Sequence, residues 1–308
     1  MSSPAGRAQR DQPDDGHGMR DETSLRVEAR GSVDHRAALA TLAAHSVEGL
    51  HHLDLEAGAF TRWVDIGGEP QLVTTRLDEG GASLESSVRD ASAREELARL
   101  TARWFDLEAD LGPVDAHLGA DPLFAAQVRE RPGLRITRFR QPFEAVVCTV
   151  LGQQVSLAAG RLFAARLVAA FGTAPSAGTD PAGIGAGLRV FPRPSALAAV
   201  PVEELRAAIG LTGSRARTVH EVAVLFAEQG GAAVLPQRSA LAGVRGIGAW
   251  TLDHLALRAG TDVDAFPLGD AVLRRTLAAL DPGAGAERIA SWSPYRGYAA
   301  TRLWAFGL

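Results

Sequence analysis

The chain has 308 residues, a formal net charge of −4, 46% hydrophobic and 22% charged residues, which is typical of a globular protein of one or two domains. Its single cysteine, Cys148, excludes an internal disulfide, a cysteine-ligated zinc site and a four-cysteine iron–sulfur cluster. All 32 basic residues are arginines, so a mechanism that needs a lysine amine is excluded.

The first 21 residues are polar and aperiodic, which predicts a disordered tail over 1–21. They lack the apolar segment of a signal peptide, and no apolar run is long enough to span a bilayer. We therefore expect a cytoplasmic protein with no membrane contact. The negative net charge argues against nucleic acid as a partner. A local basic surface could offset this, and the candidate is the stretch 129–140, which contains Arg129, Arg131, Arg135, Arg138 and Arg140.

Residues 22–112 have the pattern of a small α+β domain. Alternating apolar residues predict a strand within 23–31, and Asp34 is expected to cap a helix over 35–45. Three further strands are predicted at 50–55, 60–66 and 71–76, with a helix at 95–105. Consecutive strands with few helices indicate an antiparallel sheet.

Residues 113–308 are expected to be all-helical. One long helix is predicted over 142–171, because Pro142 suits a first turn and Gly172 a helix end. Shorter helical segments follow to the C-terminus. The predicted fold is thus a small antiparallel α+β domain followed by an all-α domain.

Two short helices within 241–251 are joined by Val244-Arg245-Gly246-Ile247-Gly248. The glycines permit a positive φ and close approach of another backbone, and the start of the second helix offers free N–H groups to a phosphate. Val244 and Ile247 are expected to anchor the turn in the core. An ordinary helix–turn–helix with a glycine cap is the alternative. If the turn is a helix-hairpin-helix, it would grip the DNA backbone, through Arg245, Gly246, Gly248 and Thr251.

Asp270 follows the hairpin, in the segment Phe266-Pro-Leu-Gly-Asp270, at the start of a new helix. A plain N-cap is one interpretation. A carboxylate held ionised by a helix N-terminus is compatible with that role and adds a chemical one.

The order of hairpin, second helix, connector and aspartate resembles the helix-hairpin-helix DNA glycosylase superfamily, and within it the bacterial DNA-3-methyladenine glycosylase II family. The similarity covers about residues 23–308. Matching segments are Arg131-Pro-Gly-Leu-Arg135, Leu151-Gly-Gln-Gln-Val-Ser156, the hairpin, Phe266–Asp270 and Pro294-Tyr-Arg-Gly-Tyr298 through Trp304. The resemblance implies that Asp270 is the catalytic carboxylate and that 113–308 forms two helical subdomains with the active-site cleft between them.

This resemblance also implies a reaction. The chain is expected to hydrolyse the N-glycosidic bond of alkylated bases, 3-methyladenine first, in duplex DNA, and so to start base excision repair as a monomer at the nucleoid. Relatives that also cut the strand carry a lysine two residues after the second hairpin glycine, where this chain has Trp250. We therefore expect no lyase activity. Deaminated or oxidised bases as substrates, or a non-catalytic DNA-binding module, remain alternatives.

Further site residues follow from the resemblance. Gln153 and Gln154 match the wedge that fills the gap left by a flipped nucleotide. Trp250 and Trp304 match residues that line the base pocket, with Tyr295 as a further aromatic there, and His254 replaces a tyrosine. Trp292 and Tyr298 are expected in the core. No cofactor is expected, although backbone carbonyls of Val244 and Ile247 are candidate ligands for a structural Na⁺ or K⁺.

Overall fold

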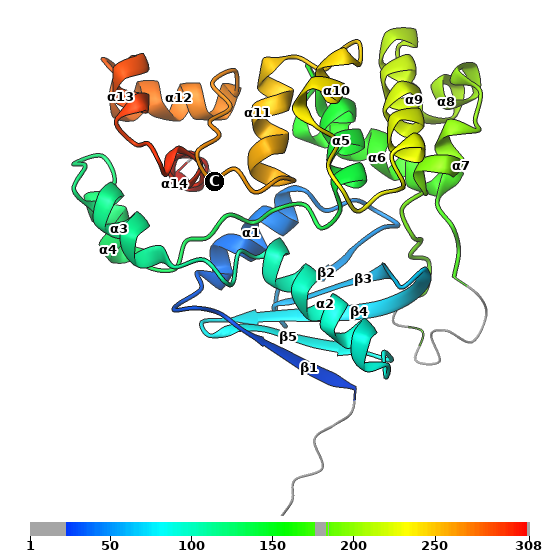
Figure 1. Cartoon of the computed structure of the whole chain (residues 1–308), viewed down its shortest axis with the longest axis horizontal. Helices are drawn as coiled ribbons and strands as arrows, with labels where there is room; N and C mark the ends of the chain where they lie inside the picture. The colour runs from blue at the N-terminus through cyan, green and yellow to red at the C-terminus, as the bar shows by residue number, and fades with distance from the viewer. Residues whose placement is uncertain (1–22, 176–182, 184, 307–308) are drawn as a thin grey trace, which may run out of the picture.

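The computed structural model of the chain describes residues 23–175, 183 and 185–306 (Figure 1). The tail predicted for residues 1–21 lies outside the described residues. The described strands form one antiparallel sheet with the order β1-β5-β4-β3-β2. Their bounds are β1 Ser24–Glu28, β2 His52–Asp54, β3 Ala59–Ile66, β4 Glu69–Asp78 and β5 Gly81–Ser86.

Strand β5 is the element of the sheet that the sequence pattern does not predict. It lies between β1 and β4, and it pairs with both. Gly81 opens it at φ +147°, where a Cβ would stand 2.2 Å from the carbonyl oxygen of Val27. Only glycine fits so close to the neighbouring strand, so this residue fixes the approach of β1 to β5.

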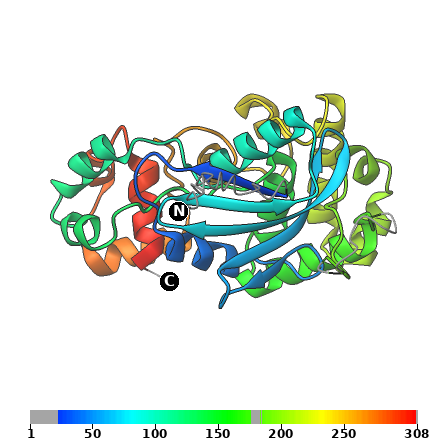
Figure 2. The same cartoon turned by 90° about the horizontal axis from the view of Figure 1, so that it is seen from below.

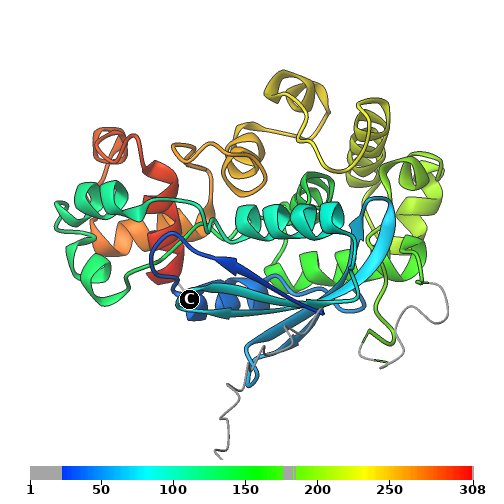
Figure 3. The ribbon, with the colours of Figure 1, turned by 60° about the horizontal axis from the view of Figure 1, so that its bottom comes forward.

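Helices α1 (His35–Ala44) and α2 (Ala91–Trp104) pack on one face of the sheet (Figures 1 and 3). Asp34 caps α1 as predicted, because its side chain accepts a hydrogen bond from the Ala37 amide at 2.9 Å. The helix α2 starts earlier than the predicted 95, since Asp90 caps it in the same way. Alternate residues of β3 and β4, such as Phe60 and Val73, face these helices and form the core of the α+β part.

The rest of the described chain is helical, which confirms the predicted fold class. In Figure 2 the sheet runs across the middle, with the C-terminal helices toward one end. The helices are α3 Leu111–Gly119, α4 Ala125–Glu130, α5 Pro142–Gly152, α6 Leu157–Phe171, α7 Pro194–Ala198, α8 Val202–Ile209, α9 Gly213–Glu228, α10 Arg238–Gly243, α11 Ala249–Arg258, α12 Ala271–Leu280, α13 Ala286–Ala290 and α14 Arg296–Phe306.

The single helix predicted over 142–171 is wrong: the structure has two helices, α5 and α6, with a break between them. Pro142 does stand in the first turn and Gly172 does end the second helix. The break arises because Gln154 adopts φ +55° and Ser156 starts a new helix by accepting a hydrogen bond from the Ala159 amide. This break places a short turn at the edge of the cavity described below.

The helices form two hydrophobic cores. One is built by α5–α11, and it includes Val244 and Ile247 of the predicted hairpin. The other joins α3 and α4 to α12–α14, with Trp292 and Tyr298 buried in it as expected. The division of the chain at residue 112 stays a prediction. Within the described residues, no helix has the length and apolar character needed to cross a membrane.

Candidate active site

The predicted hairpin is present, with α10 and α11 joined by residues 244–248. Val244 and Ile247 are buried, as expected. Gly246 adopts φ +96°, and a Cβ there would meet the Thr218 hydroxyl at 2.7 Å. Gly248 instead has φ −98° and caps α11. Nothing lies within 4 Å of the position its Cβ would take, so the start of α11 is open to another backbone.

Asp270 is the N-cap of α12, and one of its two oxygens is fully used. Oδ1 accepts hydrogen bonds from the amides of Val272 (3.0 Å) and Leu273 (2.9 Å) and from the indole Nε1 of Trp304 (3.2 Å). Among the described residues, Oδ2 has no hydrogen-bond partner. The carboxylate is therefore held in one orientation with a free oxygen.

This carboxylate lines a cavity of about 1210 Å³. The cavity lies where α1, α5, α11, α12 and α14 meet. Trp250 and His254 form one wall, stacked at 5.5 Å between ring centroids, and His254 meets Trp304 edge-on at 6.0 Å. Flat aromatic walls beside a fixed carboxylate suit a planar ligand attached to a group that becomes positively charged.

Tyr295 is not part of this pocket, so its predicted place there is wrong. Its ring packs against His117 at 5.6 Å and against Tyr298 at 6.5 Å, on the core formed with α3. It precedes α14 by one residue, whereas Trp304 lies two turns further along that helix. The two residues therefore occupy different places although both are C-terminal aromatics.

The two predicted wedge residues have different surroundings. The Gln153 amide group donates hydrogen bonds to the Gly246 carbonyl (3.0 Å) and to the Thr251 hydroxyl (2.9 Å). It thus ties the α5–α6 turn to the hairpin. Gln154 is exposed at the tip of the turn with φ +55°, a conformation that costs a non-glycine residue about 1–2 kcal/mol.

Thr251 is not available to a DNA backbone, which corrects its predicted role. Its side chain is 2% exposed and its hydroxyl is engaged by Gln153. Arg245 is exposed beside the hairpin glycines, and its amide donates a hydrogen bond to Glu221 at 3.3 Å. Gly246, Gly248 and the Arg245 side chain are therefore the predicted backbone-binding groups that remain accessible.

The arginine stretch 129–140 does not form a basic surface, contrary to expectation. Arg135, Arg138 and Arg140 are buried. Arg135 donates hydrogen bonds to five backbone carbonyls, those of Arg30, Ser32, Asp106, Leu107 and Ala109. Arg138 forms a 2.7 Å ion pair with Asp106. These side chains join the layers of the fold.

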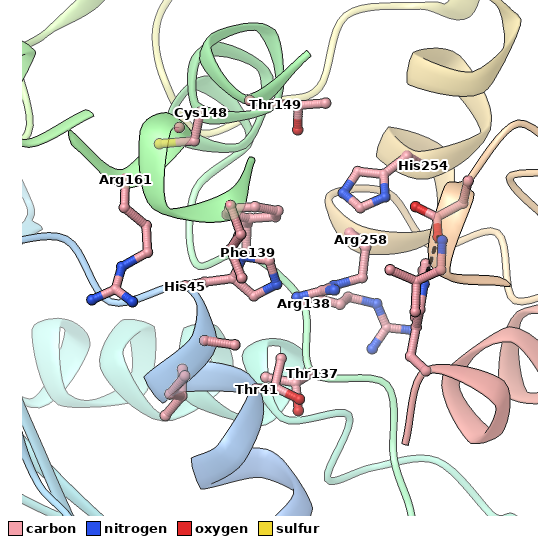
Figure 4. A pocket seen from close by; sticks show the side chains of 18 of the residues that line it. Thr41, His45, Thr137, Arg138, Phe139, Cys148, Thr149, Arg161, His254 and Arg258 are labelled. Carbon is pink, nitrogen blue, oxygen red and sulfur yellow. Dashed lines mark hydrogen bonds between the residues drawn. The ribbon is translucent and has the colours of Figure 1, made fainter. Parts of the chain in front are cut away.

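The cavity is also lined by three residues that the sequence analysis did not assign to the site. His45 comes from α1, Phe139 from the segment before α5, and Arg258 from the last turn of α11 (Figure 4). Arg258 could have been found, because Trp250, His254 and Arg258 are spaced i, i+4, i+8 on one helix face. His45 and Phe139 are brought in by tertiary packing, and no local pattern marks them.

Two of the three histidines that line the cavity, His45 and His254, lie beside Arg258 and are neutral at pH 7. Burial, assisted by Arg258 and Arg161, lowers the pKa of His45 to about 3. Burial also lowers the pKa of His254 well below its usual value, with Arg258 and His45 adding to the effect. The Cys148 thiol faces the same cavity, and burial raises its pKa, which keeps it from acting as a nucleophile.

Among the described residues, no group of three or more His, Cys, Asp or Glu side chains could hold a metal ion. In the hairpin, the Val244 carbonyl accepts a hydrogen bond from the Ile247 amide at 3.1 Å. A carbonyl oxygen has a second lone pair, so this donor set still fits the monovalent cation predicted there.

Both parts of the chain are similar to known protein families. The family models for the AlkA N-terminal domain and for the HhH-GPD superfamily base excision DNA repair protein match residues 24–140 and 147–287. The DNA-3-methyladenine glycosylase 2 of Escherichia coli is 30% identical over 217 residues, which are 69% of this chain and 72% of that protein.

A Mycobacterium tuberculosis protein described as a probable bifunctional transcriptional activator/DNA repair enzyme AlkA is 36% identical over 213 residues. The match covers 66% of this chain but 41% of that relative, so the chain spans about two fifths of the length of this relative. The solved 3-methyladenine DNA glycosylase from Archaeoglobus fulgidus superposes with a TM-score of 0.74 at 19% identity, over 92% of this chain and 97% of that one. That superposition shows a shared fold.

Proposed function

The chain belongs to the HhH-GPD superfamily of base excision DNA repair proteins, and from this membership we propose that it is a DNA glycosylase that releases alkylated bases, 3-methyladenine among them, from duplex DNA. The observation that carries the proposal is the free Oδ2 of Asp270 in an aromatic cavity beside an open hairpin. Because the proposed substrate is DNA, we place the protein in the cytoplasm at the nucleoid. We also propose that a monomer suffices for the reaction.

The proposed chemistry needs one carboxylate. When the C1′–N bond breaks, its electron pair leaves with the base and C1′ becomes an oxocarbenium ion. The negative charge on Asp270 stabilises that ion, and Oδ2 can orient the water that adds to C1′ and loses a proton. A base alkylated on a ring nitrogen is already cationic, so it leaves without a general acid.

We propose that the enzyme has no lyase activity. Strand scission through a Schiff base needs a nucleophilic amine, and the chain has no lysine. Trp250, whose ring lies in the pocket wall, occupies the position expected for that lysine. The product would be an intact strand with an abasic site.

The test is incubation of the full chain with methylated duplex DNA, with free bases measured by mass spectrometry. Release of 3-methyladenine, and strand breaks only after alkali or heat, would support the proposal. Breaks without either treatment would contradict the absence of lyase activity. DNA binding with no release of any base would favour the non-catalytic module, and release of uracil or hypoxanthine alone would favour deaminated substrates.

We propose further that Gln154 fills the gap left by the flipped nucleotide, while Gln153 holds the turn. Replacing Gln154 by glycine should relieve the positive φ and leave the free energy of unfolding unchanged or up to about 1 kcal/mol higher. Base release should fall about tenfold, because an unfilled gap favours return of the nucleotide to the stack. Calorimetry measures the predicted change in the free energy of unfolding, and single-turnover kinetics measures the predicted fall in base release. Gln154→Asn, which tolerates positive φ and keeps an amide, is the matched control and should lose less activity.

A monovalent cation at the Val244 and Ile247 carbonyls stays a proposal. Such an ion would supply positive charge where a phosphate approaches the hairpin. DNA affinity measured in K⁺ and in tetramethylammonium at equal ionic strength tests it, since equal affinities would contradict a bound cation.

A further inference from the structure

Helix α9 presents a stripe of polar residues, Arg215, Thr218 and Glu221, to the hairpin and to the α5–α6 turn. They follow one another at intervals of three residues, so they lie near one another on the same side of the helix. The Thr218 hydroxyl donates a hydrogen bond to the Arg245 carbonyl at 2.8 Å, and Glu221 Oε2 accepts one from the Arg245 amide at 3.3 Å. Two members of the stripe thus hold the hairpin in place.

Arg215, the first residue of the stripe, contacts the α5–α6 turn instead. Its Nη2 donates a hydrogen bond to the Gln153 carbonyl at 2.5 Å. Its guanidinium carbon lies 5.8 Å from the centroid of the Phe163 ring on α6, which is within cation–π range. Within the described part of the chain, this half-buried side chain makes no other hydrogen bond and no ion pair. Its polar group therefore serves the turn alone.

The backbone angles show what this hydrogen bond selects. Gln153 has φ −61° and ψ 131°, and Gln154 has φ +55°. These angles are close to those of the two central residues of a type II β-turn, whose second central residue is normally glycine or asparagine. Rotation of the peptide between the two glutamines would give a type I turn, with a negative φ at Gln154 and the Gln153 carbonyl turned to the other side. Because Arg215 binds that carbonyl, it selects the strained form.

The strained turn is fixed on the hairpin side as well. The Gln153 side chain donates hydrogen bonds to the Gly246 carbonyl and to the Thr251 hydroxyl. A residue with an unfavourable φ persists only where its surroundings fix it, and such residues cluster at functional sites. Here the contacts are made by Gln153, whereas Gln154 carries the strain and is exposed. The strain thus sets the direction of an exposed side chain beside the cavity.

We propose that Arg215 is a positioning residue that holds Gln154 in the conformation that enters the duplex, so that α9 sets the place of the wedge relative to the hairpin. A phosphate bound at the hairpin would then find the wedge already in place, and the turn would not have to be ordered while a nucleotide flips. This inference rests on the proposed glycosylase function and on the proposed role of Gln154.

Arg215→Met tests the proposal, because methionine keeps an apolar stem beside Phe163 and removes the donor to the Gln153 carbonyl. Release of 3-methyladenine from duplex DNA should fall about tenfold in single-turnover reactions, the loss expected for Gln154→Gly. Affinity for an undamaged duplex should stay within about twofold of wild type, since Thr218 and Glu221 still hold the hairpin.

Two further single variants accompany this one. Arg215→Lys keeps a charged donor on a long stem, so it should restore release to within about threefold of wild type. Arg206→Met, in an exposed ion pair with Glu203, is the matched control and should behave as wild type. Loss of activity in Arg215→Lys equal to that in Arg215→Met would contradict a role for the hydrogen bond.

A double variant separates positioning from a general effect on the fold. Gln154→Gly leaves no wedge side chain to position, so adding Arg215→Met to it should reduce release by less than about a further twofold. An arginine that only supports the fold would cause the same loss in both backgrounds. That result would overturn the inference.

A fluorescent base reports flipping without chemistry. When 2-aminopurine stands beside the damaged base, its fluorescence rises as its neighbour leaves the stack. Arg215→Met and Gln154→Gly should both reduce that rise, and a full rise in Arg215→Met would overturn the inference even if wild type released no base. If wild type neither raised the fluorescence nor released a base, the proposed function itself would fail.

Discussion

Asp270→Asn should abolish base release, with a rate at least about a thousandfold below wild type, and leave DNA affinity nearly unchanged. Asparagine has the same shape and is as good an N-cap as aspartate. Its Oδ1 can accept the same hydrogen bonds from Val272, Leu273 and Trp304. The substitution therefore removes the negative charge that the carboxylate would direct at C1′, and it changes little else. Single-turnover release of 3-methyladenine measures the effect, and affinity for an undamaged duplex checks the fold.

Asp253→Asn is the control for this change. Asp253 lies on α11 and pairs with Arg238 at 2.8 Å on an exposed face, and exposed pairs contribute about 1 kcal/mol or less. Its variant should release base at the wild-type rate. If Asp270→Asn were as active as Asp253→Asn, the carboxylate would be a helix cap alone.

Glu144→Gln should have the largest effect on stability, a loss of about 3–5 kcal/mol in the free energy of unfolding. Glu144 lies in the first turn of α5 and is buried, with Oε2 2.7 Å from Arg62 Nη2 and Oε1 3.1 Å from Nη1. Arg140 is a second buried arginine, and burial, with Arg62, lowers its pKa to about 9 while Glu144 raises it. One carboxylate thus offsets two cations.

Other groups compensate for that loss only in part, because Glu96 and Asp65 raise the pKa of Arg140 less than Glu144 does. His51 contacts Arg62 at 3.1 Å, and burial, together with Arg62, lowers its pKa well below the usual value, so it stays neutral. Urea unfolding at pH 7 is the measurement. Glu203→Gln, in the exposed pair with Arg206, should change stability by less than about 1 kcal/mol. Equal midpoints for the two variants would mean that the Arg62–Glu144 pair between β3 and α5 adds nothing to the fold.

Local patterns were sufficient for the elements that position the site. The caps at Asp34 and Asp270 are signalled by a short polar residue before an apolar helix. The hairpin is signalled by two glycines with Val244 and Ile247, whose burial follows from their spacing. Each of these features is determined within a few residues of chain, which is why the sequence predicts them.

Tertiary contacts decided the rest. Thr251 and Tyr295 have the residue types expected of a site. In the fold, however, the Thr251 hydroxyl accepts a hydrogen bond from Gln153, and the Tyr295 ring packs against α3 away from the cavity. The arginines of 129–140 suggest a basic surface when the sequence is considered alone. In the fold, Arg135 is instead buried among backbone carbonyls from distant segments. Phe139 and His45 reach the cavity from segments that are far apart in the chain, so no window of sequence joins them.

The pocket wall combines residues that the sequence indicates with contacts that only the tertiary structure determines. Trp250 and His254 follow from the resemblance, whereas Arg258 was missed, although helical spacing could have indicated it. Asp106 pairs with the neighbouring Arg138 and accepts a hydrogen bond from Tyr298, and only the folded chain brings these three residues together.

Affinity for a cationic sugar mimic tests most directly whether a fixed negative charge faces C1′. Two duplexes are compared, one with a pyrrolidine in place of the damaged nucleoside and one with neutral tetrahydrofuran. Wild type should bind the pyrrolidine duplex at least about a hundredfold more tightly, because it resembles the transition state, and Asp270→Asn should bind both alike. Equal affinity of wild type for the two duplexes would contradict the account.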